Sequence, residues 1–339
     1  MIHELYRFRL CDHAFKKQMY LNPTSILLAT LSVNDLKVQY RARAGTVRAV
    51  DGVSFGLAGG ESVGIVGESG CGKSTLGLTL MRALQGGLVE SGEAFLDGTP
   101  ILGMPEEEFS RTVRWKKISM VFQGAMNSLD PVFSIRQQFE EVLKEHRYHG
   151  DMSMALGEAL SSVGLQPSVL DRFPHELSGG MKQRAVIAMA LLLKPELVIA
   201  DEPTTALDVL VQAQILGLLK GLKKSGMTVV LISHDLGIVS EICDKVAIMY
   251  AGKIVEFGTL EEVYDSPKHP YTQALLKATP KLRGEKDLVS LKGAPPSLAS
   301  VGPGCRFYDR CPMAMEKCRQ DPPTVKTGSG YVACWLYRE

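Results

Sequence analysis

Short apolar runs alternate with longer amphipathic stretches from about residue 31 to residue 264. The runs have the length and residue types of strands, which we predict at 31–40, 47–57, 62–66, 92–96, 118–122, 197–200 and 229–232. The last two are continuously apolar, as strands buried on both faces of a sheet are. A helical period runs through 131–170, and a helix is predicted at 209–224. This alternation indicates an α/β fold with a mainly parallel central sheet.

The character of the chain changes after about residue 264. Prolines become frequent, and residues 293–304 combine Pro, Gly and Ser as a linker does. We therefore expect an N-terminal extension at 1–29, a main domain at 30–264 with a helical subdomain at about 125–180, and a C-terminal region at 265–339. The extension has no clear periodicity, and Met19 is as good a candidate for the true start as Met1.

Composition narrows the functional classes. Of the 339 residues, 45% are apolar, which is enough for a large buried core. The net charge of +1 provides no field to steer the chain toward nucleic acid, so no nucleic-acid partner is expected. No apolar stretch approaches the roughly 20 residues that a membrane-spanning helix needs, and the N-terminus lacks the pattern of a signal peptide. We expect a soluble, cytoplasmic chain.

A glycine-rich segment follows the strand predicted at 62–66. Residues 67–74 read GESGCGKS, a full match to the phosphate-loop pattern G-x-x-x-x-G-K-[ST]. Glycines let backbone N–H groups surround a phosphate, and the helix that follows directs its positive end at the same anion. Lys73 would reach the β- and γ-phosphates of ATP, and the Ser74 hydroxyl would bind Mg²⁺. The predicted nucleotide-binding residues here are Gly67, Glu68, Ser69, Gly70, Cys71, Gly72, Lys73, Ser74 and Thr75.

Two carboxylates end a second apolar strand. Residues 197–202 read LVIADE, so Asp201 and Glu202 lie at its carboxyl end. Asp201 would hold Mg²⁺, and Glu202 would polarise the water that attacks ATP. The alternative is that the two acids cap the next helix. Two acids after a buried strand are costly without a role, which favours the catalytic interpretation.

A third motif, LSGGMKQR at 177–184, gives the chain its resemblance to the ATPases of ABC transporters. Six features occur in the order of that family: the phosphate loop, Gln123, LSGGMKQR, LVIADE, the ALD of 206–208, and His234. The resemblance covers the chain from about residue 31 to the C-terminus. It implies a P-loop NTPase fold of the ABC type, with a RecA-like core sheet, an antiparallel β subdomain, a helical subdomain and a small Cys-rich appendage.

The signature motif can be interpreted from its residues and, separately, from the resemblance to the family. Ser178 is a good N-cap, and the small residues after it leave backbone N–H groups for an anion. The resemblance implies that two subunits pack head to tail and that each signature closes on the other subunit's ATP. Met181 stands where the commonest version has Gln. The implied contacts to the partner subunit's ATP come from Leu177, Ser178, Gly179, Gly180, Met181, Lys182 and Gln183.

Four further roles are implied by the resemblance. Gln123 would contact Mg²⁺ and the attacking water, and His234 would contact the γ-phosphate and support Glu202. Asp208 would lie at the dimer interface, and Tyr40 would stack on adenine. From the residues alone, a Gln such as Gln123 is more often a solvated strand end and a His such as His234 is usually structural, while a core or surface position is a fair alternative for Tyr40.

Three local features resemble the oligopeptide, dipeptide and nickel importer ATPases: QGAMNSLDPVFSI at 123–135, HPYTQALL at 269–276, and four cysteines near the C-terminus. Structural zinc sites use closer cysteine pairs, and the spacings miss both ferredoxin patterns, so spacing leaves an iron–sulfur cluster, zinc and free thiols open. The resemblance implies a structural [4Fe–4S] cluster with the ligands Cys305, Cys311, Cys318 and Cys334.

The combined interpretation is an ATP-hydrolysing subunit that powers uptake of di- or oligopeptides, or of a related solute such as nickel or oligosaccharide, from the cytoplasmic face of the membrane. The implied partners are two permease subunits, a second and distinct ATPase, and an extracytoplasmic solute-binding protein. A permease helix would fit near Gln123 and residues 127–135. Rival interpretations are an ABC ATPase acting on DNA or ribosomes, which near-neutral charge does not support, and a degenerate regulatory subunit, which intact Glu202 and His234 disfavour.

Overall fold

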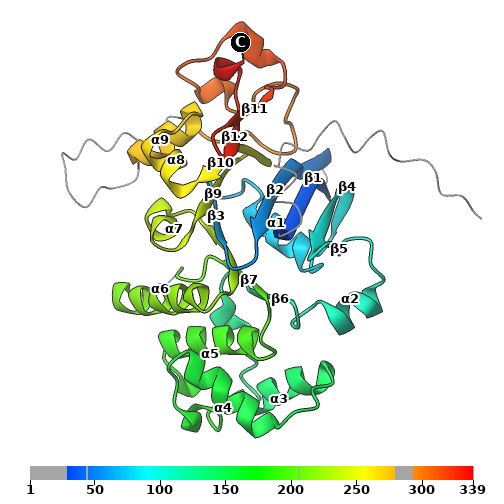
Figure 1. Ribbon diagram of the computed structural model, residues 1–339, viewed down its shortest axis with the longest axis vertical. Helices are drawn as coiled ribbons and strands as arrows, with labels where there is room; N and C mark the ends of the chain where they lie inside the picture. Colours follow the sequence, from blue (N-terminus) through cyan, green and yellow to red (C-terminus); the bar gives the residue numbers. More distant parts are fainter. Residues whose placement is uncertain (1–28, 43–44, 206, 279–292, 339) are drawn as a thin grey trace, which may run out of the picture.

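The computed structural model describes residues 29–42, 45–205, 207–278 and 293–338. The predicted N-terminal extension up to residue 28, with both candidate start residues, lies outside the described residues, as does Ala206 of the predicted ALD motif. Two sheets form the middle of the molecule, a helical layer lies at one end and the C-terminal region lies at the other (Figure 1).

The larger sheet has eight strands in the order β11-β12-β10-β9-β3-β8-β7-β6. Five neighbouring strands in it are parallel: β9 (Lys245–Tyr250), β3 (Ser62–Val66), β8 (Thr228–Ser233), β7 (Leu197–Asp201) and β6 (Ile118–Val121). Every residue of β3, β6, β7 and β8 is buried, which is why these strands are mainly apolar. The predicted α/β fold with a mainly parallel core sheet is confirmed.

Three antiparallel strands continue this sheet at one edge. They are β10 (Lys253–Thr259), β12 (Gly330–Ala333) and β11 (Thr324–Thr327). Glu256 and Phe257 of β10 pair with Val332 and Tyr331 of β12. The last strands of the C-terminal region are therefore hydrogen-bonded to the core sheet, a connection that the sequence patterns did not predict.

The smaller sheet is antiparallel, in the order β2-β1-β4-β5. Its strands are β1 (Ala29–Ala42), β2 (Gly45–Ala58), β4 (Gly87–Leu96) and β5 (Thr99–Pro100). Buried residues such as Val33 and Val53 form one core cluster with Ile65 of the larger sheet and Leu76 of helix α1 (Lys73–Leu80). Helix α1 contacts strands of both sheets, so its start is held where the two sheets meet.

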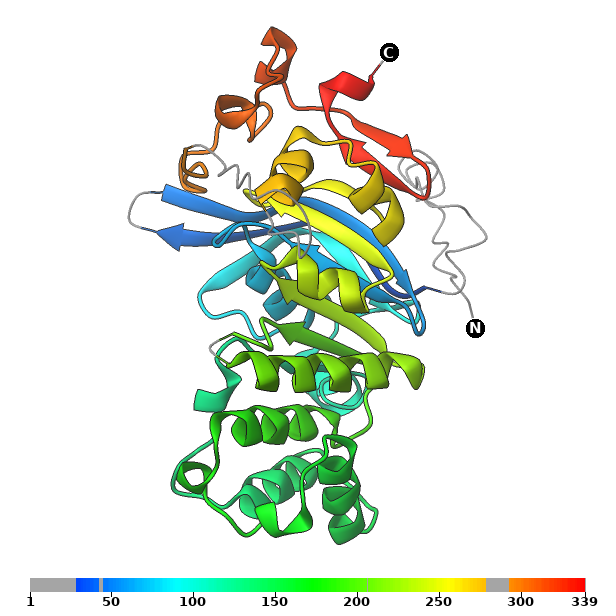
Figure 2. The same ribbon diagram turned by 90° about the vertical axis from the view of Figure 1, so that its left-hand side faces the viewer.

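The helical layer contains α3 (Ile135–Glu145), α4 (Met152–Ser162) and α5 (Gly179–Leu191), and it lies beyond β6 and β7 in both views (Figures 1 and 2). Helix α3 shows how sequence sets this layer. Ser134 and Gln137 form a capping box at its start, and Ile135, Phe139 and Leu143 bury one face.

The remaining helices follow the strands in sequence: α2 (Glu106–Thr112), α6 (Val209–Lys224), α7 (Leu236–Ile242), α8 (Leu260–Asp265) and α9 (Pro270–Ala278). The described residues also form six short 3₁₀ turns: Ala125–Asn127, Pro167–Val169, Pro174–Glu176, Tyr308–Arg310, Glu316–Arg319 and Trp335–Tyr337. Within the described ranges, no helix is both long and apolar enough to cross a membrane.

Candidate active site

The phosphate loop, residues 67–74, connects the end of β3 to the start of α1. Close packing requires two of its glycines. A Cβ atom at Gly67 would lie 2.0 Å from the carbonyl oxygen of Met249, and one at Gly72 would lie 2.0 Å from that of Ala49. Gly72 also has a φ of 106°, in the left-handed region that favours glycine. The loop is therefore a tight turn against β2 and β9, the kind of turn that binds phosphate through backbone N–H groups.

Lys73, the first residue of α1, folds its side chain back into this loop. Only 6% of the residue is exposed, and its ammonium donates to the carbonyl oxygens of Gly67 at 2.7 Å and Glu68 at 3.1 Å. A buried ammonium needs such acceptors, because burying an unpaired charge is expensive. The positive charge therefore lies within the turn that was predicted to receive the β- and γ-phosphates.

Asp201 ends strand β7 and is 2% exposed. Burial raises the pKa of its carboxyl, although a hydrogen bond from Ser74 works in the opposite direction. Its Oδ1 atom is buried without a hydrogen-bond partner among the described residues. A buried oxygen of this kind calls for a ligand, and Mg²⁺ prefers carboxylate and hydroxyl oxygens. The donor set of Asp201 and Ser74 therefore fits Mg²⁺.

Glu202 and His234 are in direct contact. The Nδ1 atom of His234 lies 2.8 Å from both carboxylate oxygens of Glu202, and the Thr205 hydroxyl donates to the same carboxylate at 2.7 Å. Burial opposes ionisation of Glu202, but these two hydrogen bonds outweigh it and hold its pKa below the usual range. Glu202 is therefore an ionised acceptor at neutral pH. The sequence analysis missed Thr205, which no motif marks.

The backbone at Glu202 is also unusual. Its φ is 49°, in the left-handed region that few residues other than glycine adopt. Its N–H donates to the carbonyl oxygen of Ile232 at 2.9 Å, which ties the end of β7 to β8 two residues before His234. Backbone in such regions concentrates at functional sites because the surrounding structure must hold it there.

Tyr40 lies on β1, next to the start of α1. Its hydroxyl is 3.5 Å from that of Thr75, and its ring packs so close to Gly87 that a Cβ there would lie 2.8 Å from the ring. The aromatic ring is thus beside the phosphate loop, at the surface where the sheets meet. This placement is compatible with the expected contact to adenine, which stays a prediction.

The signature segment begins helix α5. Ser178 is its N-cap and accepts a hydrogen bond from the N–H of Met181 at 3.4 Å, as its residue type predicts. Ser178 and Gly179 are exposed, whereas Gly180 packs against α6 so tightly that a Cβ would lie 2.8 Å from Val211. The start of α5 is therefore open on one side and fixed on the other.

One side chain connects the signature helix to the segment after the catalytic strand end, and another caps the helix that follows. The buried Gln183 donates to the carbonyl oxygen of Pro203 at 2.8 Å, so this predicted signature residue faces its own subunit's core. Asp208 caps α6 and accepts from the N–H of Val211 at 3.0 Å. Val209 and Leu210, which follow it, are 78% and 77% exposed. The expected place of Asp208 at a dimer interface stays a prediction.

Gln123 follows the end of β6, and its side chain is exposed. Apolar side chains are exposed on the same stretch of chain, with Phe122 at 37%, Val132 at 73% and Phe133 at 47%. The turn after Gln123 also touches the signature, since a Cβ at Gly179 would lie 3.5 Å from the sulfur of Met126. The structure thus places Gln123 between the end of the core sheet and the helical layer.

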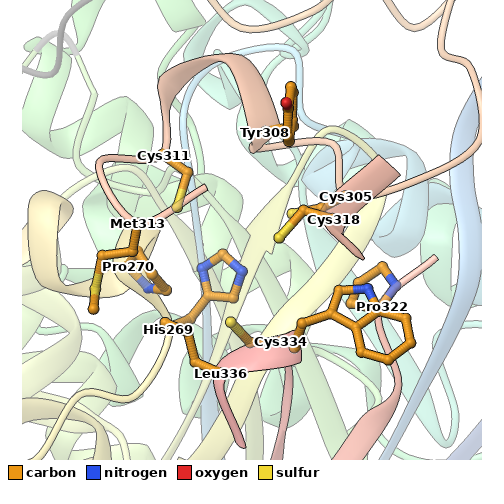
Figure 3. Close-up of a pocket in the computed structure, with 11 residues that line it drawn as sticks. His269, Pro270, Cys305, Tyr308, Cys311, Met313, Cys318, Pro322, Cys334 and Leu336 are labelled. Carbon is orange, nitrogen blue, oxygen red and sulfur yellow. The ribbon is translucent and has the colours of Figure 1, made fainter. Parts of the chain in front are cut away.

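The C-terminal cysteines line one pocket (Figure 3). It belongs to the C-terminal region, which lies at the far end of the molecule from the helical layer (Figure 1). The segments of the cysteines are joined by backbone hydrogen bonds, such as that from Cys305 to Cys318 at 2.8 Å. The imidazole of His269 lies among them, and Pro322 lies to one side (Figure 3). Trp335 also lines the pocket. The structure brings together four thiols from separate turns, namely Cys305, Cys311, Cys318 and Cys334.

The thiols influence one another. Burial raises the pKa of Cys305 to about 11, a backbone hydrogen bond lowers it, and the neighbouring Cys318, Cys311 and Cys334 raise it further. None of the cysteines in the described part of the chain forms a disulfide. In those same ranges, no three His, Cys, Asp or Glu side chains are arranged to hold a metal ion. The four cysteines therefore lie together in one pocket, while the predicted iron–sulfur ligation stays a prediction.

Comparison with known proteins agrees with these features. Residues 50–205 match the family described as ABC transporter, and residues 255–318 match the C-terminal region of oligopeptide/dipeptide transporters. The oligopeptide transport ATP-binding protein OppD of Salmonella typhimurium is 45% identical over 325 residues, which cover 92% of this chain and 94% of that protein. AppD of Bacillus subtilis, also an oligopeptide transport ATP-binding protein, is 42% identical over 319 residues, covering 91% and 97%.

A solved structure shares the fold. It is a dimer of the ATP-binding cassette MJ0796 in a post-hydrolysis state bound to ADP and Pi, with a TM-score of 0.61 and 28% identity. The likeness covers 68% of this chain and 98% of that one. From its motifs, fold and relatives, the chain belongs to the ATP-binding, ATP-hydrolysing proteins of ABC transporters, in the oligopeptide/dipeptide branch.

Proposed function

We propose that the phosphate loop, Asp201, Glu202 and His234 form the ATP-hydrolysing site and that its turnover powers uptake of di- or oligopeptides. The observation that carries the proposal is the contact of an ionised Glu202 with His234, beside a buried Asp201 whose Oδ1 atom has no hydrogen-bond partner in the described part of the chain. A degenerate regulatory subunit would not need this pair.

Each residue of the site has a role in the proposed reaction. The backbone of the phosphate loop and Lys73 hold the β- and γ-phosphates, and Glu202 accepts a hydrogen bond from the attacking water and aligns it with the γ-phosphorus. A hydrogen bond from Nδ1 of His234 to Glu202 fixes the position of that base. Bound Mg²⁺, held by Ser74, Asp201 and Gln123, would neutralise charge on the phosphates. The ring of Tyr40 stacks on adenine.

We propose that the signature of one subunit completes the site of another. The exposed start of α5 at Ser178 and Gly179 supports this, since an open helix N-terminus attracts phosphate. The exposed Val209 and Leu210 beside Asp208 support a subunit interface at that place. In this arrangement ATP joins two subunits, and hydrolysis releases them.

The transport partners are proposed from the relatives and the surface. The similar proteins carry names of oligopeptide transport subunits, so we propose two membrane permeases, a second and distinct ATPase, and an extracytoplasmic solute-binding protein as partners at the cytoplasmic face. The exposed Phe122, Val132 and Phe133 near Gln123 offer an apolar surface for a permease helix. We also propose the division into a main domain at 30–264 and a C-terminal region at 265–339.

The four-cysteine pocket is proposed to hold a [4Fe–4S] cluster, with Zn²⁺ as the alternative. The support for this proposal is that all four thiols line one pocket. Among the described residues, no three His, Cys, Asp or Glu side chains are arranged to hold a metal ion, so the ligation itself is for experiment to decide. Iron, zinc and sulfide analysis of purified protein, with absorbance at about 400 nm for the cluster, tests the proposal.

The function itself is tested by Glu202→Gln. Because Gln keeps the shape of the side chain but is a poor base, we expect turnover of ATP to fall by about 100-fold or more, while Mg-ATP binding and ATP-dependent association with the partner ATPase persist. Glu241→Gln, at an exposed carboxylate paired with Lys220, is the matched control and should hydrolyse normally. Normal turnover in Glu202→Gln would remove Glu202 from the mechanism.

A further inference from the structure

An arginine of the C-terminal region forms an ion pair with a residue of the phosphate loop. The guanidinium of Arg310 donates to both carboxylate oxygens of Glu68, at 2.6 Å and 2.9 Å, although the two residues are 242 positions apart. The Arg310 side chain is 6% exposed and that of Glu68 is 23% exposed. Glu68 is the second residue of the GESGCGKS loop. A nearly buried ion pair with two parallel hydrogen bonds fixes the relative orientation of the two side chains as well as stabilising their contact.

A second contact from the same region holds the backbone of Glu68. Its N–H donates to the hydroxyl of Tyr271 at 3.0 Å, and Tyr271 is fully buried at the start of α9. The ring of Tyr271 packs 4.5 Å from that of Tyr250, whose hydroxyl accepts a hydrogen bond from Arg310 at 3.1 Å. Both the side chain and the backbone of one phosphate-loop residue are thus anchored by residues outside the loop.

The same arginine lies on the chain segment between two cysteines of the pocket. Arg310 ends the 3₁₀ turn between Cys305 and Cys311, and this turn is closed by the backbone hydrogen bonds from Tyr308 to Cys305 and from Cys311 to Tyr308. Phe307 of this stretch packs against Tyr250 and Tyr271 at 5.2 Å and 5.3 Å between ring centroids. A shift of either cysteine therefore moves the turn that carries Arg310.

The Pro-rich segment of the C-terminal region also lies beside the loop. Pro295, Pro296, Ser297 and Leu298 face residues 68–71 across a cavity of about 320 Å³. The carbonyl oxygen of Leu298 accepts a hydrogen bond from the N–H of Arg48 at 3.4 Å, which attaches this segment to β2. The loop is therefore bordered by the C-terminal region on more than one side.

We propose that Arg310 is a positioning residue for the phosphate loop, and that through it the integrity of the four-cysteine pocket sets the affinity for Mg-ATP. The inference rests on the proposed function of the loop as the nucleotide site. Without the guanidinium, Glu68 is a partly buried carboxylate without its main counter-charge, so the loop moves to solvate it and the N–H cradle is less well formed before ATP arrives.

The first test measures Mg-ATP affinity of the full chain with a fluorescent ATP analogue. Arg310→Gln and Glu68→Gln should each weaken binding by about tenfold, and the double variant should be no worse than either alone. For Arg310→Gln, KM for ATP should rise while kcat at saturation stays within about twofold, because Glu202 and His234 are untouched. Arg319→Gln, at an exposed pair with Glu316 in the same region, is the control and should bind as wild type does.

The second test asks whether the cysteine pocket acts through Arg310. Cys311→Ser should weaken Mg-ATP binding in the wild-type background and add nothing in the Arg310→Gln background. Hydrogen exchange of residues 67–73 should speed up in both single variants, a change that a loss of folded protein elsewhere would not produce. Glu68→Gln lies outside the C-terminal region, so it keeps the test valid if the other variants fold poorly.

The outcomes separate the two proposals. If the wild-type chain does not bind Mg-ATP, the proposed function fails. If it does and both Arg310→Gln and Glu68→Gln bind equally well, the positioning role is overturned. If those two variants are weak but Cys311→Ser adds its own loss on top of Arg310→Gln, the pocket acts by another route and the link to Arg310 is wrong.

Discussion

The nucleotide site and the cysteine-rich C-terminal region meet at Glu68 but are built in different ways. The site gathers the carboxyl ends of neighbouring parallel strands, where β3, β7 and β8 deliver the phosphate loop, Asp201 with Glu202, and His234. The C-terminal region joins the core sheet through β12, and many of its other segments are turns held by single side chains, such as Arg310 on Glu68. Sheet topology positions the whole of the first region, whereas specific side-chain pairs position much of the second. Changes in the first should therefore affect chemistry most, and changes in the second stability and affinity.

The largest expected effect comes from Lys73→Ala. It removes the buried positive charge of the phosphate loop, so turnover of ATP should fall by about 100-fold to 1,000-fold, since one electrostatic contact to the reacting group is lost. A steady-state phosphate-release assay measures this. Lys224→Ala, at an exposed lysine, is the control. Turnover within a few fold of wild type would show that the loop is not the catalytic phosphate site.

The next effect concerns Glu256, which fastens the HPYT segment to the core sheet. Its buried carboxylate accepts hydrogen bonds from the N–H groups of Lys268 at 2.7 Å and His269 at 2.9 Å. Glu256→Ala leaves both donors without this acceptor, and we expect the free energy of unfolding to drop by about 2–3 kcal/mol. Urea denaturation followed by circular dichroism measures it, with the exposed Glu261→Ala as control.

Glu256 also tests whether the two regions unfold together. It lies on β10, which pairs with β9 of the core on one side and β12 of the C-terminal hairpin on the other. We therefore expect a single unfolding transition for both regions, and its midpoint should move to a lower urea concentration in Glu256→Ala. Two unfolding transitions, of which only one moves, would show that the C-terminal region is a separate folding unit.

The difference between the regions also explains what the sequence predicts. The phosphate loop, LSGGMKQR and LVIADE predict the site because each is a local spacing that a strand end or helix start must satisfy. The bond from Tyr331 to Ser54 spans 277 residues, and that from Arg310 to Glu68 spans 242. No period or motif encodes such pairs, because they depend on how distant turns pack. The pairing of β12 with β10 escapes prediction for the same reason.

Thr205 is a smaller omission within the site itself. Its hydroxyl helps to hold the pKa of Glu202 below the usual range, so the carboxylate stays ionised to lower pH than an ordinary glutamate does. Turnover should be independent of this group near neutral pH and fall as the pH drops through that low pKa. Thr205→Val removes a hydrogen bond to the charged form, so the acidic limb should move to higher pH, and Thr205→Ser should restore it. A kcat–pH profile checks both, and an unmoved limb would assign it to another group.

The smallest effect expected is at Tyr331, which fastens the C-terminal hairpin to the smaller sheet. Its hydroxyl donates to the carbonyl oxygen of Ser54 at 2.7 Å, and its ring packs 5.7 Å from that of Phe257. Tyr331→Phe keeps the ring and removes only the hydrogen bond, so the free energy of unfolding should fall by about 1 kcal/mol with ATP turnover unchanged. Lys326→Ala, at an exposed position of the same hairpin, should change neither. A loss of turnover in Tyr331→Phe without a loss of stability would contradict this expectation, because the hydrogen bond to Ser54 would then act directly on ATP hydrolysis.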